Sequence, residues 1–248
     1  MNKYFAARKT TRSFSDKDIK DSTIKEILEA ACRAPTTGNM QLYSVIITRD
    51  PDKKANLAPA HFSQPAYMNA PVILTFCADF NRFTQWCKIS NADPGFDNIQ
   101  SFVAAALDTV ILAQQFITIA EMEGLGTCYL GTTTYNPDKI SKVLELPALV
   151  VPVITVALGY PEGKQADSDR LNIDSFVFNE KYKTFGENEL KRIFAEKESR
   201  EDSLNFIKEN NKETLAQVFT DVRYPRSNNE HFSKVFIDFL YTGGFLKH

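Results

Sequence analysis

The segment from Asn98 to Glu123 constrains the fold most strongly, because its pattern predicts a long helix that is apolar on nearly every side. Alanine, leucine, valine, isoleucine and phenylalanine fill most positions between Ala104 and Ala120. A helix without a polar face must lie at the centre of a protein or pack against a copy of itself in a dimer. Asp108, Gln114 and Gln115 interrupt the apolar run, so we do not expect it to span a membrane.

Composition restricts the class of protein. A chain of 248 residues suits one large domain or two small ones, and an apolar fraction of 43% is enough to build a core. The net charge of -2 argues against nucleic acid as a partner. The four cysteines form neither a CxxC pair nor a Cys/His cluster with zinc spacing, so we expect reduced thiols and no metal site. The first residues lack the apolar core of a signal peptide, which favours the cytoplasm.

The sequence predicts four strands, over Leu42 to Thr48, Pro71 to Ala78, Thr127 to Gly131 and Val150 to Pro161. Pro71 to Ala78 and Val150 to Pro161 are predicted to be buried, and the first is the clearest because it is short, continuously apolar and rich in β-forming residues.

Helices are predicted over 2–7, 23–31 and 137–144, with Asp21 or Ser22 as the N-cap of the second. Residues 49–56 are expected to form a linker of turn and charged residues. We expect 57–67 to be a helix or an ordered loop in which His61 has a structural role.

The polar turn Thr36-Thr37-Gly38-Asn39 lies between a predicted helix and a predicted strand. It combines three hydrogen-bonding side chains with a glycine, which tolerates unusual backbone angles. Two interpretations remain open, a well-capped connecting loop and one wall of a binding site.

Arg8 and Arg12 are four residues apart, so both guanidinium groups can face one anion if the segment is helical or tightly turned. Arginine binds phosphate through two parallel hydrogen bonds and stays charged when it loses water. The alternative is a solvated basic patch near a terminus. Lys164 and Arg170 could add cations from far along the chain.

The aromatic residues Phe80, Phe83, Trp86 and Phe96 lie among polar residues in 79–97. They indicate a lid over a flat ligand, a dimer contact or local packing. Gly124-Leu125-Gly126 mimics a dinucleotide fingerprint, but it follows a helix and opens a strand, the reverse of that motif's setting. We interpret Gly124 as a helix C-cap.

Three motifs in this order and spacing resemble the nitroreductase family: Arg8-Lys9-Thr10-Thr11-Arg12-Ser13-Phe14, Ala34 to Gln41 and Glu123 to Gly131. The segments Phe76 to Arg82 and Phe236 to Leu240 are similar to its oxygen-insensitive NADPH nitroreductase and flavin reductase subgroup. The resemblance covers nearly the whole chain.

The resemblance implies an α+β fold, with a mainly antiparallel central sheet flanked by helices. It implies a domain-swapped homodimer with one FMN at each interface site. Residues 1–248 would form a single domain, with 171–248 as a C-terminal helical extension and arm.

The resemblance also implies the binding residues, with the turn at 36–39 reaching the flavin of the other subunit. The residues that we therefore expect to bind the cofactor are Arg8, Lys9, Thr10, Arg12, Thr36, Thr37, Asn39, Gln64, Tyr129, Leu130, Gly131, Lys164 and Arg170.

The chain departs from the subgroup at three points. Arg8 stands where histidine is frequent, and Ser168 stands where a lysine is usual. Either Lys164 replaces that lysine or the site has one cation fewer. No residue between Arg200 and Lys212 clearly matches the arginine that binds the 2′-phosphate of NADPH, so NADPH and NADH both remain candidates.

The function implied is hydride transfer from NAD(P)H through bound FMN to a planar acceptor by a ping-pong mechanism. Nitroaromatics, quinones and free flavin are the acceptors expected, with Phe80, Phe83 or Trp86 beside the site. Such chemistry needs no catalytic side chain or metal, because the flavin does it. The alternatives are a non-enzymatic flavin carrier or sensor, and a related flavoenzyme that dehalogenates or fragments flavin.

Overall fold

In the computed structural model, which describes residues 3–246, the chain divides into two compact units. Residues 1–166 and 232–248 form the first unit, here called the body, and 167–231 form the second, here called the arm. The body begins with helix α1 (Lys3–Ala7), as predicted; residue 2 of that prediction lies outside the described residues.

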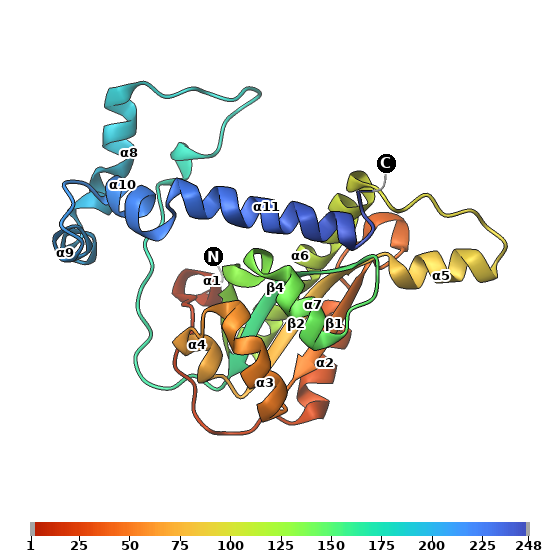
Figure 1. Ribbon diagram of the computed structural model, residues 1–248. Helices are drawn as coiled ribbons and strands as arrows, with labels where there is room; N and C mark the ends of the chain where they lie inside the picture. Colours follow the sequence, from red (N-terminus) through yellow and green to blue (C-terminus); the bar gives the residue numbers. More distant parts are fainter. Residues whose placement is uncertain (1–2, 247–248) are drawn as a thin grey trace. The chain divides into compact units, whose positions relative to one another are not determined.

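The body is built on a four-stranded sheet in the order β1-β2-β4-β3 (Figure 1). Every neighbouring pair is antiparallel, which confirms the sheet that the sequence predicted. The strands are β1 (Tyr43–Thr48), β2 (Val72–Asp79), β3 (Gly126–Leu130) and β4 (Val150–Gly159). The order leaves β1 and β3 as edge strands, so each has one side without a strand partner.

Helices cover both faces of this sheet (Figure 1), and β2 shows why. Successive strand residues point to opposite faces, so Leu74 packs in one apolar cluster and Ile73 in the other. A strand buried on both faces is expected to be mostly apolar, and β2 is buried at every position and apolar except at Thr75 and Asp79. The first face holds α2 (Asp21–Ala31) and α6 (Ile99–Met122), and the second holds α3 (Pro51–Leu57), η2 (Ala58–His61), α4 (Pro65–Met68) and α7 (Pro137–Leu144).

The helix α6 is the predicted apolar helix, and it begins where the Asn98 side chain accepts a hydrogen bond from the Ser101 amide at 3.0 Å. By length and composition it would be long enough to cross a membrane, contrary to our expectation from its polar interruptions. Its buried residues, among them Leu112 and Phe116, nevertheless pack against the sheet. The helix is therefore the core helix of the body.

Two local predictions were wrong. Residues 51–56, expected as part of a linker, form most of α3, which the Asp50 side chain caps by accepting from the Lys53 amide at 2.8 Å, with Pro51 at the first position. The N-cap of α2 is Lys20, not Asp21 or Ser22, and its side chain donates no capping bond. Asp21 lies in the first turn instead, where it offsets the positive end of the helix.

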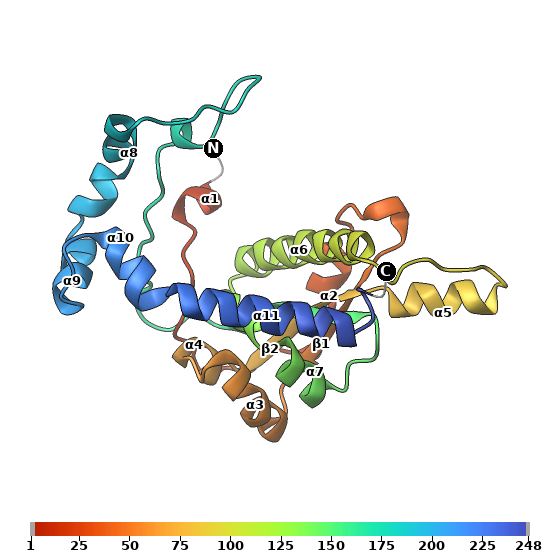
Figure 2. The same ribbon diagram turned by 45° about the horizontal axis from the view of Figure 1, so that its top comes forward.

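The arm contains η4 (Ile173–Ser175), α8 (Glu187–Ser199), α9 (Glu201–Glu209), α10 (Leu215–Gln217) and the π-turn η5 (Val218–Arg223). Within the C-terminal helical extension predicted over 171–248, the helical run is broken at Arg200, which has an extended backbone. The chain re-enters the body in α11 (Arg226–Thr242). The end of α11 lies beside α6 (Figure 2), with the rings of Phe236 and Phe102 5.7 Å apart.

A substitution at Gly126 can test whether the N-terminal segment packs closely on β3. The Thr11 amide donates to the Thr127 carbonyl at 2.9 Å, so this segment lies against the free edge of β3. A Cβ on Gly126 would come within 2.5 Å of the Thr11 hydroxyl oxygen. We expect Gly126→Ala to lower the free energy of unfolding by about 1–3 kcal/mol in denaturant titrations, through overpacking.

The matched control is Gly95→Ala, because a Cβ at Gly95 has open space around it. Equal stability changes in the two variants would contradict the close packing of Thr11 on β3.

Candidate functional site

The N-terminal segment and the loop after β4 run side by side. Phe14 pairs with Pro161 as a β-bridge, and the Glu162 amide donates to the Ser13 carbonyl at 3.0 Å. The Gln165 side chain accepts from the Arg12 amide at 3.2 Å. The fold thus places the loop of Lys164 next to the segment of Arg8 to Arg12, although 150 residues separate them in sequence.

Arg8 is held by a buried carboxylate. Its Nε donates to Oε2 of Glu121 at 3.1 Å and its Nη2 to Oε1 at 3.0 Å. The hydroxyls of Tyr4 and Thr127 also donate to Glu121, whose side chain is 8% exposed. Burial and then Glu121 raise the pKa of Tyr4 to about 12. Glu121 therefore offsets the charge of Arg8, a contact that sequence reasoning missed, and a role of Arg8 in anion binding stays a prediction.

Arg12 is different, because its side chain is exposed and forms no ion pair within residues 3–246. Burial raises the pKa of Cys128 in β3, while the charges of Arg12 and Arg8 act to lower it. Both guanidinium groups thus act electrostatically on the middle of β3. Lys9 and Thr10, between them, are half-buried. An unpaired arginine beside an edge strand is suited to an anionic ligand.

The other predicted residues of this region lie where β3 ends. Tyr129 is 51% exposed, Leu130 is buried, and exposed Gly131 begins η3 (Gly131–Tyr135). Burial and then Tyr135 raise the pKa of Tyr129. Gln64, half-buried, precedes α4.

His61 joins these two segments, because its Nδ1 lies 3.0 Å from the hydroxyl of Thr132 in η3. The imidazole is fully buried and its ring lies 4.9 Å from that of Tyr67. Burial lowers the pKa of His61 to about 4, so the ring is neutral near pH 7. Its bond to Thr132 brings the segment of Gln64 to the end of β3.

The predicted polar turn is pinned by Asp108, which is 2% exposed in the middle of α6. The Oδ1 atom of Asp108 accepts from the amide and hydroxyl of Thr37 at 2.8 and 2.9 Å, and Oδ2 accepts from the Leu42 amide at 3.3 Å. Gly38, Asn39 and Gln41 all have left-handed backbones (φ 54°, 58° and 55°). A turn of this shape is costly for residues other than glycine, so it depends on the bonds that hold it.

This turn, which contains η1 (Thr37–Asn39), and the N-terminal segment are held at separate points of α6. Asp108 and Glu121 anchor the two and lie 13 residues apart in α6, which is about 20 Å along the helix axis. The structure therefore gathers the predicted residues into two groups. Residues 8–12, 64, 129–131 and 164 lie along and beside β3, and residues 36, 37 and 39 form the turn on Asp108.

Arg170 belongs to the arm, where it is exposed and lines a pocket of about 460 Å³. The pocket also holds Arg192 and the ion pair of Lys197 with Asp169, at 2.8 Å. Lys197 is the main cause that lowers the pKa of Asp169. A phosphate role for Arg170 stays a prediction.

Comparisons with known proteins decide the family. The family model described as "Nitroreductase family" matches residues 5–160. The chain belongs to the nitroreductase family.

Individual proteins that are similar to this nitroreductase-family chain have names consistent with that family. It is 31% identical over 180 residues to "FMN reductase [NAD(P)H]" of Bacillus subtilis, covering 70% of this chain and 71% of the relative. It is 28% identical over 184 residues to "Oxygen-insensitive NADPH nitroreductase" of Salmonella typhimurium, covering 74% and 75%. A crystal structure of a Bacteroides fragilis protein is 48% identical, with a TM-score of 0.97, and the match covers 99% of this chain and 100% of that one.

The aromatic residues of 79–97 pack locally for the most part. Phe80 is 2% exposed and stacks on Phe96 with ring centroids 4.7 Å apart, and Phe83 meets both rings edge-on. Only Trp86 of the four, on α5 (Asn81–Ile89), is largely exposed. Local packing is therefore the right interpretation for Phe80, Phe83 and Phe96.

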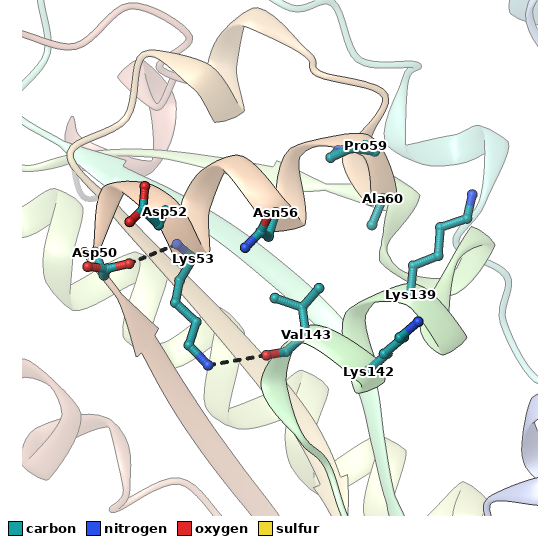
Figure 3. Close-up of a pocket in the computed structure, with 9 residues that line it drawn as sticks. All are labelled: Asp50, Asp52, Lys53, Asn56, Pro59, Ala60, Lys139, Lys142 and Val143. Carbon is teal, nitrogen blue, oxygen red and sulfur yellow. Dashed lines mark hydrogen bonds between the residues drawn. The ribbon is translucent and has the colours of Figure 1, made fainter.

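A groove of about 570 Å³ lies between α3 and α7, away from the candidate site (Figure 3). None of the predicted binding residues lines it. Two of its three lysines have partners: Lys53 reaches Glu145 and the Val143 carbonyl, and Lys139 donates to Asn136 at 2.8 Å. We assign no site to it.

His61 makes stability depend on pH. Its pKa is about 4 when folded and about 6.5 when unfolded, so between these values the unfolded chain binds more protons and stability rises with pH. From pH 7 to pH 5 the group should cost about 2 kcal/mol of folding free energy. Urea titrations of wild type and His61→Gln at both pH values measure this, and equal losses in the two proteins would contradict it.

Proposed function

We propose that the protein is an NAD(P)H-dependent FMN oxidoreductase that reduces nitroaromatics, quinones or free flavin by a ping-pong mechanism. One observation carries this proposal. Arg12, a cation without an ion-pair partner among residues 3–246, lies beside β3, and the segment of Gln64 lies near Gly131, where β3 has ended. The names of the relatives, an FMN reductase and an NADPH nitroreductase, support the reaction class.

The donor set fits FMN. Arg12, Thr10 and Lys164 would bind its phosphate, and Gln64 with the backbone at Leu130 and Gly131 would meet its ring. FMN, when bound, would supply hydride transfer between the nicotinamide and the acceptor at one shared place. The cation of Arg12 would offset negative charge on that cofactor. Glu121 keeps Arg8 in place and so orders the segment that presents Arg12.

A homodimer completes this proposal. Apolar residues of α6 remain exposed in a stripe at helical spacing: Ile99, Val103, Leu107, Val110 and Ile111. A stripe of this kind is typical of an interface. The turn on Asp108 is about 20 Å along α6 from the anchor of Arg8, so we propose that Thr36, Thr37 and Asn39 serve the partner's FMN. The dimer is proposed to be domain-swapped, with 171–248 as the extension of a single domain.

The first test mixes the FMN-loaded protein with NADPH or NADH in a stopped-flow instrument. We expect the flavin absorbance near 450 nm to bleach on the order of seconds or faster and to recover when a quinone is added. A flavin that neither nicotinamide bleaches would contradict the enzyme and leave a carrier or sensor.

The second test removes the unpaired cation. Arg12→Ala should weaken FMN binding at least tenfold, which is about 1.4 kcal/mol or more for a charge-assisted contact. The FMN dissociation constant measured by fluorescence quenching gives the result. Lys25→Ala, at an exposed position on α2, is the control and should bind FMN like wild type. Equal dissociation constants for Arg12→Ala and wild type would argue against Arg12 as a ligand.

A further inference from the structure

Three aromatic rings from distant parts of the body meet beside the end of β3. Tyr135 of η3 and Phe232 of α11 stack with centroids 4.4 Å apart and planes at 7°. Phe62 meets Phe232 edge-on at 6.0 Å and Tyr135 at 6.4 Å. We call Phe62, Tyr135 and Phe232 the aromatic wall. Aromatic pairs in such geometries attract each other, so the three rings hold one another in place.

The exposed ring of Phe62 is carried by a strained backbone. Phe62 and Ser63 both have left-handed backbones, with φ of 52° and 47°, and neither is glycine. The neighbouring Ala60, Ala66 and Tyr67 are buried, yet Phe62 is 51% exposed. Strained residues of this kind cluster at functional sites, because strain persists only where the surrounding structure maintains it.

The aromatic wall borders the residues that the proposed function assigns to the flavin ring, and the inference rests on that function. Phe62 lies two residues before Gln64, and Tyr135 ends the η3 turn that starts at Gly131. The bond of His61 to Thr132 fixes the turn of Phe62 against η3. Half-exposed Tyr129, whose pKa is raised in part by Tyr135, adds a fourth ring at this end of β3.

We propose that the aromatic wall, with Tyr129, forms one side of the acceptor site and selects flat, uncharged aromatic acceptors of the quinone class. Uncharged rings with exposed faces favour flat, weakly solvated molecules over compact anions, which would lose hydration without gaining a partner. The quinone receives a hydride, which is two electrons and one proton, takes a second proton from water and leaves as a hydroquinone. NADPH or NADH supplies that hydride and is oxidised.

The experiment uses the FMN-loaded protein, Phe62→Ala and two acceptors, menadione as the flat uncharged quinone and ferricyanide as a compact anion. Alanine keeps the Cβ and hence the backbone strain at position 62, and removes only the ring. We expect kcat/KM for menadione to fall five- to twenty-fold, mainly through KM. Turnover of ferricyanide and FMN content should stay within twofold of wild type.

Two further variants keep the result specific. Phe62→Tyr retains the ring and should keep menadione turnover within twofold of wild type. Tyr182→Ala removes an exposed aromatic ring of the arm that also has one edge-on neighbour, Phe178 at 5.1 Å, and should change neither acceptor's kinetics. Unchanged menadione kinetics in Phe62→Ala, or equal losses of turnover with both acceptors, would overturn the assignment of the aromatic wall to the acceptor site. A wild-type flavin that no nicotinamide reduces would instead overturn the proposed function.

Discussion

The carboxylate of Asp108 is the contact on which much of the body depends. It is buried in the middle of a mostly apolar helix, where an ionised group without partners would be very unfavourable. The Thr37 amide, the Thr37 hydroxyl and the Leu42 amide supply those partners. In return, the helix determines the shape of the turn and the point at which β1 begins. Removing the carboxylate would leave two backbone amides of a strained turn without their acceptor.

Glu121 repeats this arrangement near the C-terminal end of α6. Each carboxylate binds a segment that is far away in sequence, and the apolar residues around them pack on the sheet. The helix thus has two roles, filling the core and fixing the distance between two groups of predicted binding residues. The two anchor points are about 20 Å apart along the helix axis, which is the basis for the proposal of a site shared between subunits.

Local patterns predicted the strands, α6 and α7, because buried strands and apolar helices carry their signal in neighbouring residues. The helix α3 was missed because its charged residues obscured the Asp50-Pro51 start signal. The resemblance to the nitroreductase family supplied the candidate residues. It did not reveal that Glu121 binds Arg8, 113 positions away, or that Phe62 has a left-handed backbone, since both depend on tertiary contacts.

The position of β3 at the edge of the sheet has a consequence beyond ligand binding. An open strand edge can pair with another molecule and start aggregation. Here the segment around Thr11 lies on that edge, through the bond from its amide to Thr127, and Gly126 leaves room for it. The segment around Thr11 and Arg12 therefore covers the edge of β3 and blocks intermolecular strand pairing there. Under the proposed function, in which Arg12 binds the ligand, solubility and ligand affinity are linked through one stretch of chain, so selection on either would act on the other.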